Sequence, residues 1–399
     1  MPQAAGVWLT ASRGYCVKAI ILAGISALAL GACTAMPAAT PGMNAEAILA
    51  APAQFRIVSD AEVAADQPTM ATSGDVKTYV GDFLTWVVAP GRLIERSALF
   101  MTGEPPGMPE GADFNAIVEA LAEEEHPAAM LIFSANDPAI LLALADKGDP
   151  TAKLAVAMNN ISTGSLQQKI DARDWLRSQS PANRDAAYAL GQFLLSQIGG
   201  GDMMEFGVGG GGATPGEVRE GAALLVEVAK AAPLDIMLQI GTLMGAHPGV
   251  DADVDGHARK ILELVVAETD ATPLPAPSFG DELEEGDMDA YLAYETKMGE
   301  LAGAVEARVA LAGLLAKGHG GPADIARATA LYRSALEATQ DYRAYEALIE
   351  LGVDVSEFDA LFAPPEDGED WWNLEEPADP AEGAWEEEPE PAPPVHAPH

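Results

Sequence analysis

The fold is decided by the stretch ARVALAGLLAKGHGGPADIARATALYRSA, residues 307–335. Apolar residues recur every three or four positions on both sides of its centre, which is the spacing of amphipathic helices. Gly318-His319-Gly320 interrupts this pattern, and glycines placed so closely together favour a turn. The stretch therefore predicts two helices joined by a short connection.

Parts of this stretch recur along the chain. Four segments place a small residue one helical turn ahead of two bulky ones, and they begin at Ala172, Ala222, Ala258 and Ala328. On one helical face, the small residue lets a neighbouring helix approach closely while the bulky pair fills the groove. A second helix type has the cores Leu190-Gly191, Ile240-Gly241 and Leu311-Ala312. The sequence thus predicts two helix types that alternate.

The spacing of the small residues predicts the architecture. Ala222 and Ala258 lie 36 residues apart, and the longer intervals contain insertions in the Gly-rich residues 199–212 and in residues 269–303. A period of this length with two helices per unit is typical of an α-solenoid, in which each unit buries its apolar face against its neighbours. We therefore expect an all-α fold, with a solenoid over residues 129–362.

The stretch 307–335 resembles the Sel1-like repeat, a relative of the tetratricopeptide repeat. The likeness rests on the Gly318-x-Gly320 turn, on Asp324 and on Ala328 with its Leu331-Tyr332 pair. It covers residues 135–355 in about five units, and residues 286–303 are expected to add a helix of their own. The resemblance implies a concave surface that binds protein segments or organises an envelope complex.

The N-terminal residues predict export and lipid attachment. Arg13 and Lys18 precede the apolar residues 19–30, and small residues follow. This order is that of a secretory signal. Leu30-Gly31-Ala32-Cys33 resembles the lipobox of bacterial lipoproteins, which implies that the chain is cut before Cys33 and that Cys33 is acylated. The alternative is an ordinary secretory signal with a chance cysteine.

The same resemblance implies a cellular location. Thr34, rather than Asp, follows the cysteine, and in the sorting pattern of well-studied Gram-negative bacteria this favours the outer membrane. We expect a protein of the cell envelope that is lipid-anchored and faces the periplasm. No later stretch reaches the roughly 20 apolar residues that cross a bilayer, so the N-terminal lipid would be the membrane anchor.

The mature chain would be strongly acidic. Removal of residues 1–32 leaves 61 acidic and 20 basic residues. This charge argues against nucleic acid and anionic lipid headgroups as partners, because phosphate binding needs positive side chains. Cys16 would leave with the signal, so neither a free thiol nor a disulfide is expected. A protein partner with a basic or apolar face fits this charge.

Composition divides the chain into five parts. They are a signal peptide (1–32), a tether (33–52), a mainly helical N-terminal region (53–128), the repeat solenoid (129–362) and an acidic tail (363–399). The tail has twelve acidic residues and neither Lys nor Arg. Such a composition cannot build a core, so the tail is expected to be disordered.

Three apolar residues stand out in this tail, Trp371, Trp372 and Leu374. They either pack back onto the solenoid or form a short linear motif for a protein partner. A third alternative is that they have no role.

One acidic stretch has the spacing of a calcium site. Asp251-x-Asp253-x-Asp255-Gly256 matches the start of an EF-hand loop, whose alternate oxygens surround the ion. The position where this motif carries its bidentate acid holds Leu262. A solvated acidic turn that leads into the helix of Ala258 explains the same residues, and a weak calcium site is the alternative.

Other patterns do not indicate chemistry. Gly207-x-Gly209-x-x-Gly212 matches a dinucleotide fingerprint in letters only, because a helix and not a strand precedes it. The six histidines lack metalloprotease spacing, and no nucleophile elbow occurs. We therefore expect no enzyme activity, no catalytic residue, no cofactor and no resident metal ion.

The function that follows is that of an envelope lipoprotein acting as a protein-binding adaptor or scaffold. Two alternatives remain, a structural subunit of an outer-membrane assembly machine and a weak calcium-binding envelope protein.

Overall fold

The computed structural model describes residues 44–96, 105–134, 137–196, 214–246, 248–271 and 288–362. Within these ranges the chain is 73% helix and forms no β-strand. The predicted all-α class is therefore confirmed. None of the helices in these ranges combines the length and the apolar character needed to cross a bilayer.

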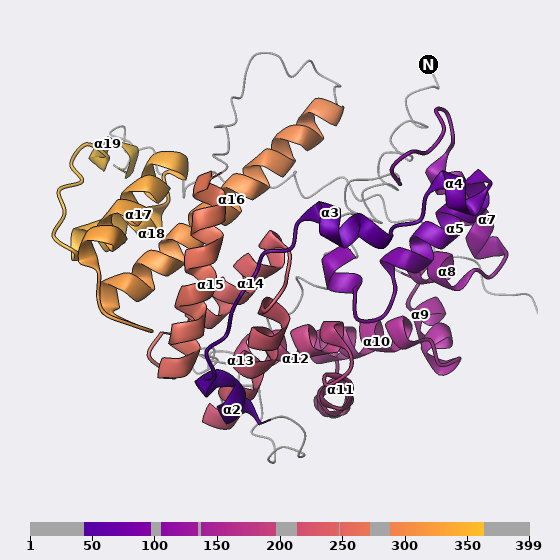
Figure 1. Ribbon diagram of the computed structural model, residues 1–399, viewed down its shortest axis with the longest axis horizontal. Helices are drawn as coiled ribbons and strands as arrows, with labels where there is room; N and C mark the ends of the chain where they lie inside the picture. Colours follow the sequence, from indigo (N-terminus) through magenta and orange to yellow (C-terminus); the bar gives the residue numbers. More distant parts are fainter. Residues whose placement is uncertain are drawn as a thin grey trace, which may run out of the picture. The chain divides into compact units, whose positions relative to one another are not determined.

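The chain divides into two compact units between Val353 and Asp354. The second unit contributes the short helix α19 (Asp359–Phe362). In the first unit, the N-terminal part consists mostly of short helices (Figure 1): α2 (Ala45–Ala50), α3 (Asp60–Val63), α4 (Met70–Ser73), α5 (Val76–Val87), α7 (Phe114–Glu123) and α8 (Pro127–Phe133).

Ten further helices, most of them longer, make up the rest of the described part of the first unit. They are α9 (Pro138–Asp146), α10 (Pro150–Thr163), α11 (Leu166–Gln179), α12 (Arg184–Ser196), α13 (Pro215–Ala229), α14 (Leu234–Gly245), α15 (Ala252–Ala271), α16 (Met288–Lys317), α17 (Ile325–Thr339) and α18 (Tyr342–Glu350). Each of these helices packs against the next one along the chain. Alternate helices also touch, since α12 contacts α10 and α14, and α14 contacts α16. We call this set, α9–α18, the helix row.

Small residues allow the closest approach within the row. At Gly191 of α12, a Cβ atom would lie 3.0 Å from the carbonyl oxygen of Gly221 and 2.7 Å from Cγ of Leu225, both on α13. The small residues that begin the predicted copies are all buried: Ala172, Ala222, Ala258 and Ala328. The burial predicted for these small residues is therefore confirmed.

The turn between α16 and α17 follows the predicted pattern. Gly318 and Gly320 both have positive φ angles, +70° and +69°, which a residue with a side chain rarely adopts. A Cβ on Gly320 would lie 2.4 Å from the carbonyl oxygen of Asp255. Asp324 then caps α17 by accepting a hydrogen bond from the backbone N–H of Arg327 at 3.0 Å.

The prediction of a separate helix in residues 286–303 is wrong. Helix α16 runs unbroken from Met288 to Lys317, because no proline breaks this stretch and single glycines are tolerated inside a helix. Gly303 lies within it and faces α14, where its hypothetical Cβ would be 2.8 Å from Leu238. The extra residues therefore lengthen a helix of the row instead of adding one.

A second core joins α5, α7 and α8. The sequence of residues 76–88 is compatible with a buried helix or with a strand. The structure shows a helix, α5, and the Asp75 carboxylate caps its N-terminus by accepting a hydrogen bond from the backbone N–H of Thr78. Its apolar face packs with those of the other two helices: Val80, Phe83, Leu84, Val87, Val118, Leu121, Ala128, Ala129 and Ile132.

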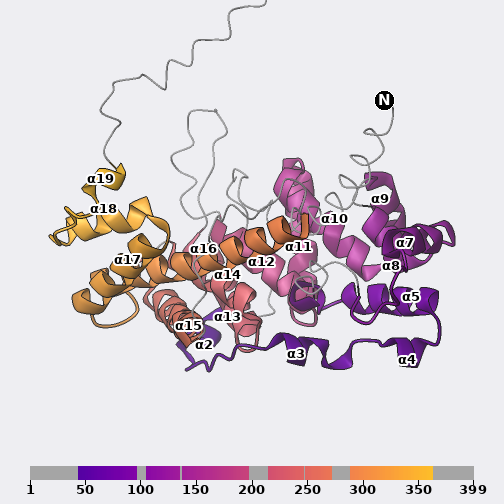
Figure 2. The ribbon, with the colours of Figure 1, turned by 90° about the horizontal axis from the view of Figure 1, so that it is seen from above.

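The residues before α3 form a segment that lies along the helix row. Helix α2 packs against α13 and α15, and both ribbon views show it beside them (Figures 1 and 2). The backbone N–H of Val58 donates to the carbonyl of Ala232 at 2.9 Å, and the Ala232 N–H donates to the carbonyl of Arg56 at 3.2 Å. We call residues 44–58 the N-terminal strap.

The strap overlaps the range 33–52 that we expected to be a tether. Within that range Leu49 of α2 is buried, and its carbonyl oxygen lies 2.8 Å from Nε2 of the buried His257 on α15. The packed part of the chain therefore includes residues that composition had assigned to the tether.

Candidate functional site

The residues to which the sequence assigns a function lie outside the described ranges. Cys33, expected to carry the lipid, precedes them, and the tail residues Trp371, Trp372 and Leu374 follow them. The Gly-rich residues 207–212 fall in a gap between two of them. All of these assignments stay predictions, and the site has to be sought among the remaining residues.

The acidic stretch predicted as a turn or calcium loop is the beginning of α15. Asp251 Oδ1 accepts hydrogen bonds from the backbone N–H groups of Asp253 and Val254, at 3.0 and 3.2 Å. Its other oxygen pairs with Arg219 Nε of α13 at 2.5 Å. Both oxygens of Asp251 are thus engaged within the protein, by a helix cap and by an ion pair.

Asp255 connects two turns of the helix row. This residue is 2% exposed, and Oδ2 accepts a hydrogen bond from the Gly249 N–H at 2.9 Å. The same oxygen lies 3.4 Å from Nδ1 of His319, which sits in the turn between α16 and α17. No group of three His, Cys, Asp or Glu side chains that could hold a metal ion occurs in the described part of the chain.

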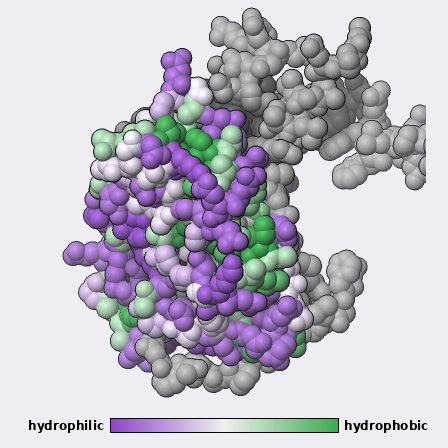
Figure 3. Space-filling model, turned by 90° about the vertical axis from the view of Figure 1, so that its right-hand side faces the viewer, coloured by the Kyte–Doolittle hydropathy of each residue, from purple (hydrophilic) through white to green (hydrophobic). Residues whose placement is uncertain are grey.

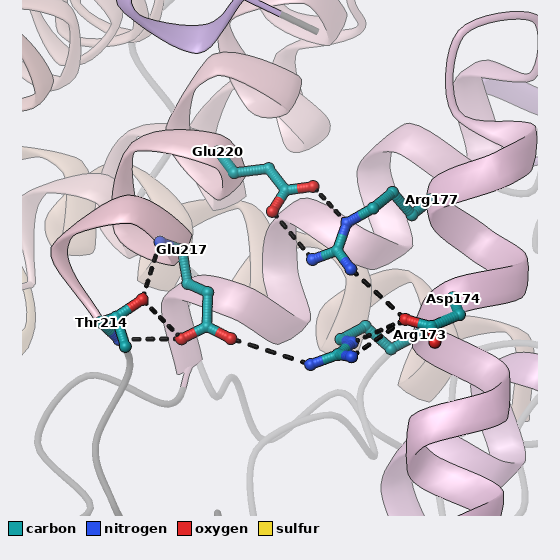
Figure 4. Close-up of polar contacts among 6 residues, drawn as sticks. All are labelled: Arg173, Asp174, Arg177, Thr214, Glu217 and Glu220. Carbon is teal, nitrogen blue, oxygen red and sulfur yellow. Dashed lines mark hydrogen bonds and ion pairs between the residues drawn. The ribbon is translucent and has the colours of Figure 1, made fainter. Parts of the chain in front are cut away.

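An ion-pair network joins α11 to the first turns of α13 (Figure 4). Arg177 of α11 donates from Nε and Nη2 to the two carboxylate oxygens of Glu220, at 2.6 and 2.9 Å. The hydrogen bonding that Arg177 donates to Glu220 is the main cause that raises the pKa of Arg177. This two-point geometry is the strong form of an arginine–carboxylate contact.

The same network includes the cap of α13. Thr214 and Glu217 form a capping box, in which each side chain binds the other residue's backbone N–H. Figure 4 shows Glu217 also pointing toward Arg173 of α11, with Oε1 at 3.9 Å from Nη1. Arg173 is buried and binds the neighbouring Asp174 at 3.0 Å. Arginines that are paired with carboxylates on another helix connect the two helices. Because arginine stays protonated, these side chains are poor proton donors for catalysis.

A buried charged cluster holds residues 91–96 to α12. Arg184 pairs with Glu95 and donates to the carbonyl of Val228 at 2.5 Å. Asp185 accepts hydrogen bonds from the backbone N–H groups of Leu93 and Ile94, at 3.2 and 3.1 Å. Burial is the main cause that raises the pKa of Asp185. We call this set the Asp185 cluster.

The neighbouring Arg96 is buried against α5. Its guanidinium lies 4.2 Å from the centre of the Trp86 ring and donates to the Trp86 carbonyl at 2.5 Å. It also pairs with Asp66 at 2.8 Å. Asp66 accepts a hydrogen bond from Trp86 Nε1 at 2.9 Å, which is the main cause that lowers the pKa of this carboxyl.

A chain of polar groups links α12 to α14. Gln192 Nε2 donates to the hydroxyl of Tyr188 at 2.8 Å, and that hydroxyl donates to Gln239 Oε1 at 2.6 Å. Burial raises the pKa of Tyr188, so its hydroxyl stays neutral. Both glutamines are half-buried, and Gln192 Oε1 has no hydrogen-bond partner within the described residues. The oxygen of Gln192 is itself buried, so this polar chain joins the two helices inside the row.

The surface also exposes single large apolar side chains. In the described ranges these are Leu142, Leu166, Val250, Ile325, Tyr342, Ile349 and Leu361. Figure 3 views the side on which α7, α8 and α9 lie, and apolar side chains gather there in patches within a mostly hydrophilic surface. Isolated exposed leucines are ordinary, whereas contiguous apolar surface marks a contact site.

Comparison of the chain with family models, with curated proteins and with solved structures finds no match. The Sel1-like resemblance and the lipoprotein signal therefore stay predictions.

Sequence reasoning missed the Asp185 cluster and the Arg177–Glu220 pair. The partners of Asp185 are 91 and 92 residues away along the chain, and the Arg177 partner is 43 residues away. Local spacing carries no signal for contacts at these separations. The composition gives no signal for them either, because the chain has 61 acidic residues and a single carboxylate does not stand out among them.

Proposed function

We propose that this protein is a lipid-anchored envelope protein that binds protein partners on the surface of a Sel1-like α-solenoid. The carrying observation is the order of packing in the helix row, where each helix from α9 to α18 contacts the next one. Arrays in which units contact mainly their chain neighbours are extended, and they present long surfaces that capture protein segments.

One side of the row is the better candidate for binding. The strap helix α2 packs on α13 and α15, so that side is already occupied by the chain itself. The other helices, α12, α14 and α16, contact one another in order. Because α2 packs on α13 and α15, we place the binding surface on the side of α12, α14 and α16.

The proposed address comes from the N-terminal sequence. Cleavage before Cys33 and acylation of its sulfur would attach the chain to a membrane, and Thr34 favours the outer membrane with the protein facing the periplasm. Two or three acyl chains exceed the single chain that gives only marginal attachment.

The anchor is tested with Cys33→Ala in cells fed radiolabelled palmitate. The expected result is a labelled wild-type protein in the membrane fraction and an unlabelled variant that is not cut before residue 33. Label on the variant, or an unlabelled wild type cut at another position, would overturn the lipid anchor.

The adaptor function is tested by crosslinking the full chain in cells, with and without residues 363–399. A discrete partner recovered from both forms puts recognition on the helix row. A partner that needs the tail would make Trp371, Trp372 and Leu374 the docking motif, and it would overturn recognition by the row. No discrete partner from either form would overturn the adaptor function itself.

A further inference from the structure

Helix α13 is buried on a side that the matching helices of the row leave open. In the four predicted copies, the position two residues after the small residue lies opposite the packing stripe. Three copies have Asp174, Lys260 and Ala330 there, and all three are exposed. Helix α13 has Leu224 at this position, which is 1% exposed. The outer side of α13 is therefore apolar and covered.

The strap supplies a cover from outside the row. Its helix α2 packs against α13 and α15, and Leu49 is the buried residue of that helix. Phe55 is half-buried, and its ring stands nearly perpendicular to that of the buried His257, with 5.9 Å between the ring centres. We call the outer side of α13, His257 and Ala232 the strap seat.

The hydrogen bonds between the seat and the strap involve only the backbone of the strap. Nε2 of His257 donates to the carbonyl of Leu49 at 2.8 Å. Ala232 donates to the carbonyl of Arg56 and accepts from the N–H of Val58. Nearly every residue offers the same backbone groups, so these three bonds do not select a sequence. Backbone pairing of this kind is a common way of holding an extended peptide.

Selection therefore comes from the apolar side chains of the strap. Leu49 is buried, and Phe55 and Ile57 are half-buried. The charged Glu46 and Arg56 are exposed. The seat thus fits a segment that has a large aliphatic residue, an aromatic residue six positions later and an aliphatic residue two positions after that. Such a segment also needs a short helix followed by extended backbone.

The strap is weakly held compared with the helices of the row. It has one buried side chain, Leu49, whereas nine of the fifteen residues of α13 are buried. Segments with few buried apolar contacts open locally at a lower free energy than the global unfolding of the protein. The strap can therefore leave its seat while the row stays folded.

We infer that the strap seat is a peptide-binding site whose resident ligand is the strap. A segment of a partner protein with the same apolar pattern binds there by displacing the strap. This goes beyond the proposed function, because it adds a second site to the surface on the side of α12, α14 and α16. The strap keeps this second site closed until a partner segment competes for it.

The test uses the full chain and a labelled synthetic peptide of residues 44–58. Leu49→Ser should release the strap, because Leu49 is its buried anchor. The peptide should then bind this variant about tenfold more tightly than the wild type, in which the seat is open for only a small fraction of the time. The matched control is Leu166→Ser on α11, a leucine that is 49% exposed, and it should bind the peptide like the wild type.

Hydrogen exchange locates the bound peptide, because hydrogen-bonded amides become protected. The amide of Ala232 should be protected in the wild type, exchange in Leu49→Ser and become protected again when the peptide binds. The amides of α12 should stay protected throughout. In the wild type, the peptide at about 1 mM, near the effective concentration of a tethered segment, should partly release the amide of Val58.

Several results would overturn the inference. They are equal binding of the peptide by all three chains, an Ala232 amide that Leu49→Ser does not change, and equal binding of a peptide that carries Leu49→Ser and Phe55→Ser. Phe55→Ser in the full chain is a second release variant, and a smaller gain in peptide affinity is expected for it. Loss of protection in α12 in both variants would also overturn the inference, because the strap would then be part of the core.

Failure here is distinguishable from failure of the adaptor function. If crosslinking in cells recovers a discrete partner while the peptide binds the wild type and Leu49→Ser equally, the adaptor function stands and the strap inference falls.

Discussion

The helix row and the N-terminal residues 44–96 are held in place by different kinds of contact. In the row, buried small and bulky apolar side chains join helices that follow one another along the chain, as Gly191 and Leu225 do for α12 and α13. The N-terminal residues contact the row over long sequence separations, through the packing of α2 on α13 and α15 and through buried polar contacts, such as the hydrogen bond that Asp185 accepts from Ile94. The first kind of contact follows from local periodicity, and the second depends on the complete fold.

The difference predicts where single substitutions cost most. A buried carboxylate that serves two backbone donors cannot be replaced by a neighbour, whereas an apolar contact in the row is shared among many side chains. Four predictions test this comparison, in order of decreasing effect.

The largest loss is expected for Asp185→Ala. The substitution removes the carboxylate that accepts hydrogen bonds from the N–H groups of Leu93 and Ile94, which costs about 3 kcal/mol of unfolding free energy in total. Urea denaturation measures it. The control is Asp253→Ala, an exposed acid in the first turn of α15, for which less than about 0.5 kcal/mol is expected. Similar losses for both variants would contradict the importance of the Asp185 cluster.

A smaller loss is expected for Gly191→Val. The new side chain would meet the backbone of Gly221 on α13, and overpacking of this kind costs about 2 kcal/mol. Gly299→Val is the matched control in α16, because no atom lies within 4 Å of its hypothetical Cβ. Thermal unfolding should show a lowered Tm for the first variant only. An unchanged Tm for Gly191→Val would mean that α12 and α13 do not approach as described.

Ion pairs within the row should contribute less to the unfolding free energy than the Asp185 hydrogen bonds or the Gly191 packing. A double-mutant cycle with Arg177→Met and Glu220→Gln is expected to give a coupling of about 1 kcal/mol, because the pair is bidentate and mostly buried. The comparison pair is Arg343 and Glu306, whose side chains are 55% and 41% exposed. A coupling near 0.3 kcal/mol is expected there. Equal couplings would remove the distinction between the two pairs.

The smallest effect is a pH dependence at Asp66. The hydrogen bond from Trp86 holds the pKa of Asp66 below its ordinary value. A carboxyl with a lowered pKa stabilises the folded state above its unfolded pKa and loses this contribution as the pH falls through the folded pKa. Asp66→Asn should therefore cost about 0.5 kcal/mol at neutral pH, after allowance for solvent screening, and nothing at pH values well below the folded pKa. Urea midpoints at several pH values measure it, and a difference that grows on acidification would contradict the sign.

The residues show why part of the fold could be predicted and part could not. Ala222, Ala258 and Ala328 mark helices whose packing depends on neighbours nearby in the sequence, so their spacing alone predicts burial. The strap could not be predicted, because Leu49 meets His257 across 208 residues and short apolar segments resemble a tether. Of the residues described in the candidate site, the acidic spacing singled out Asp251 and Asp255, and the partners of Asp185 and Arg177 lie too far along the chain for a local pattern to show them. The exposure of Leu142 depends on which neighbours α9 lacks, and a sequence pattern does not contain that information.

The central claim is that the helix row captures a protein partner, and crosslinking from single positions in cells tests it most directly. A photoreactive residue is placed, one position at a time, at Leu142, Leu166, Ile325 and Ile349, which are exposed on α9, α11, α17 and α18. The account predicts one discrete protein adduct from at least one of these positions. The absence of a discrete adduct from all four positions would contradict it.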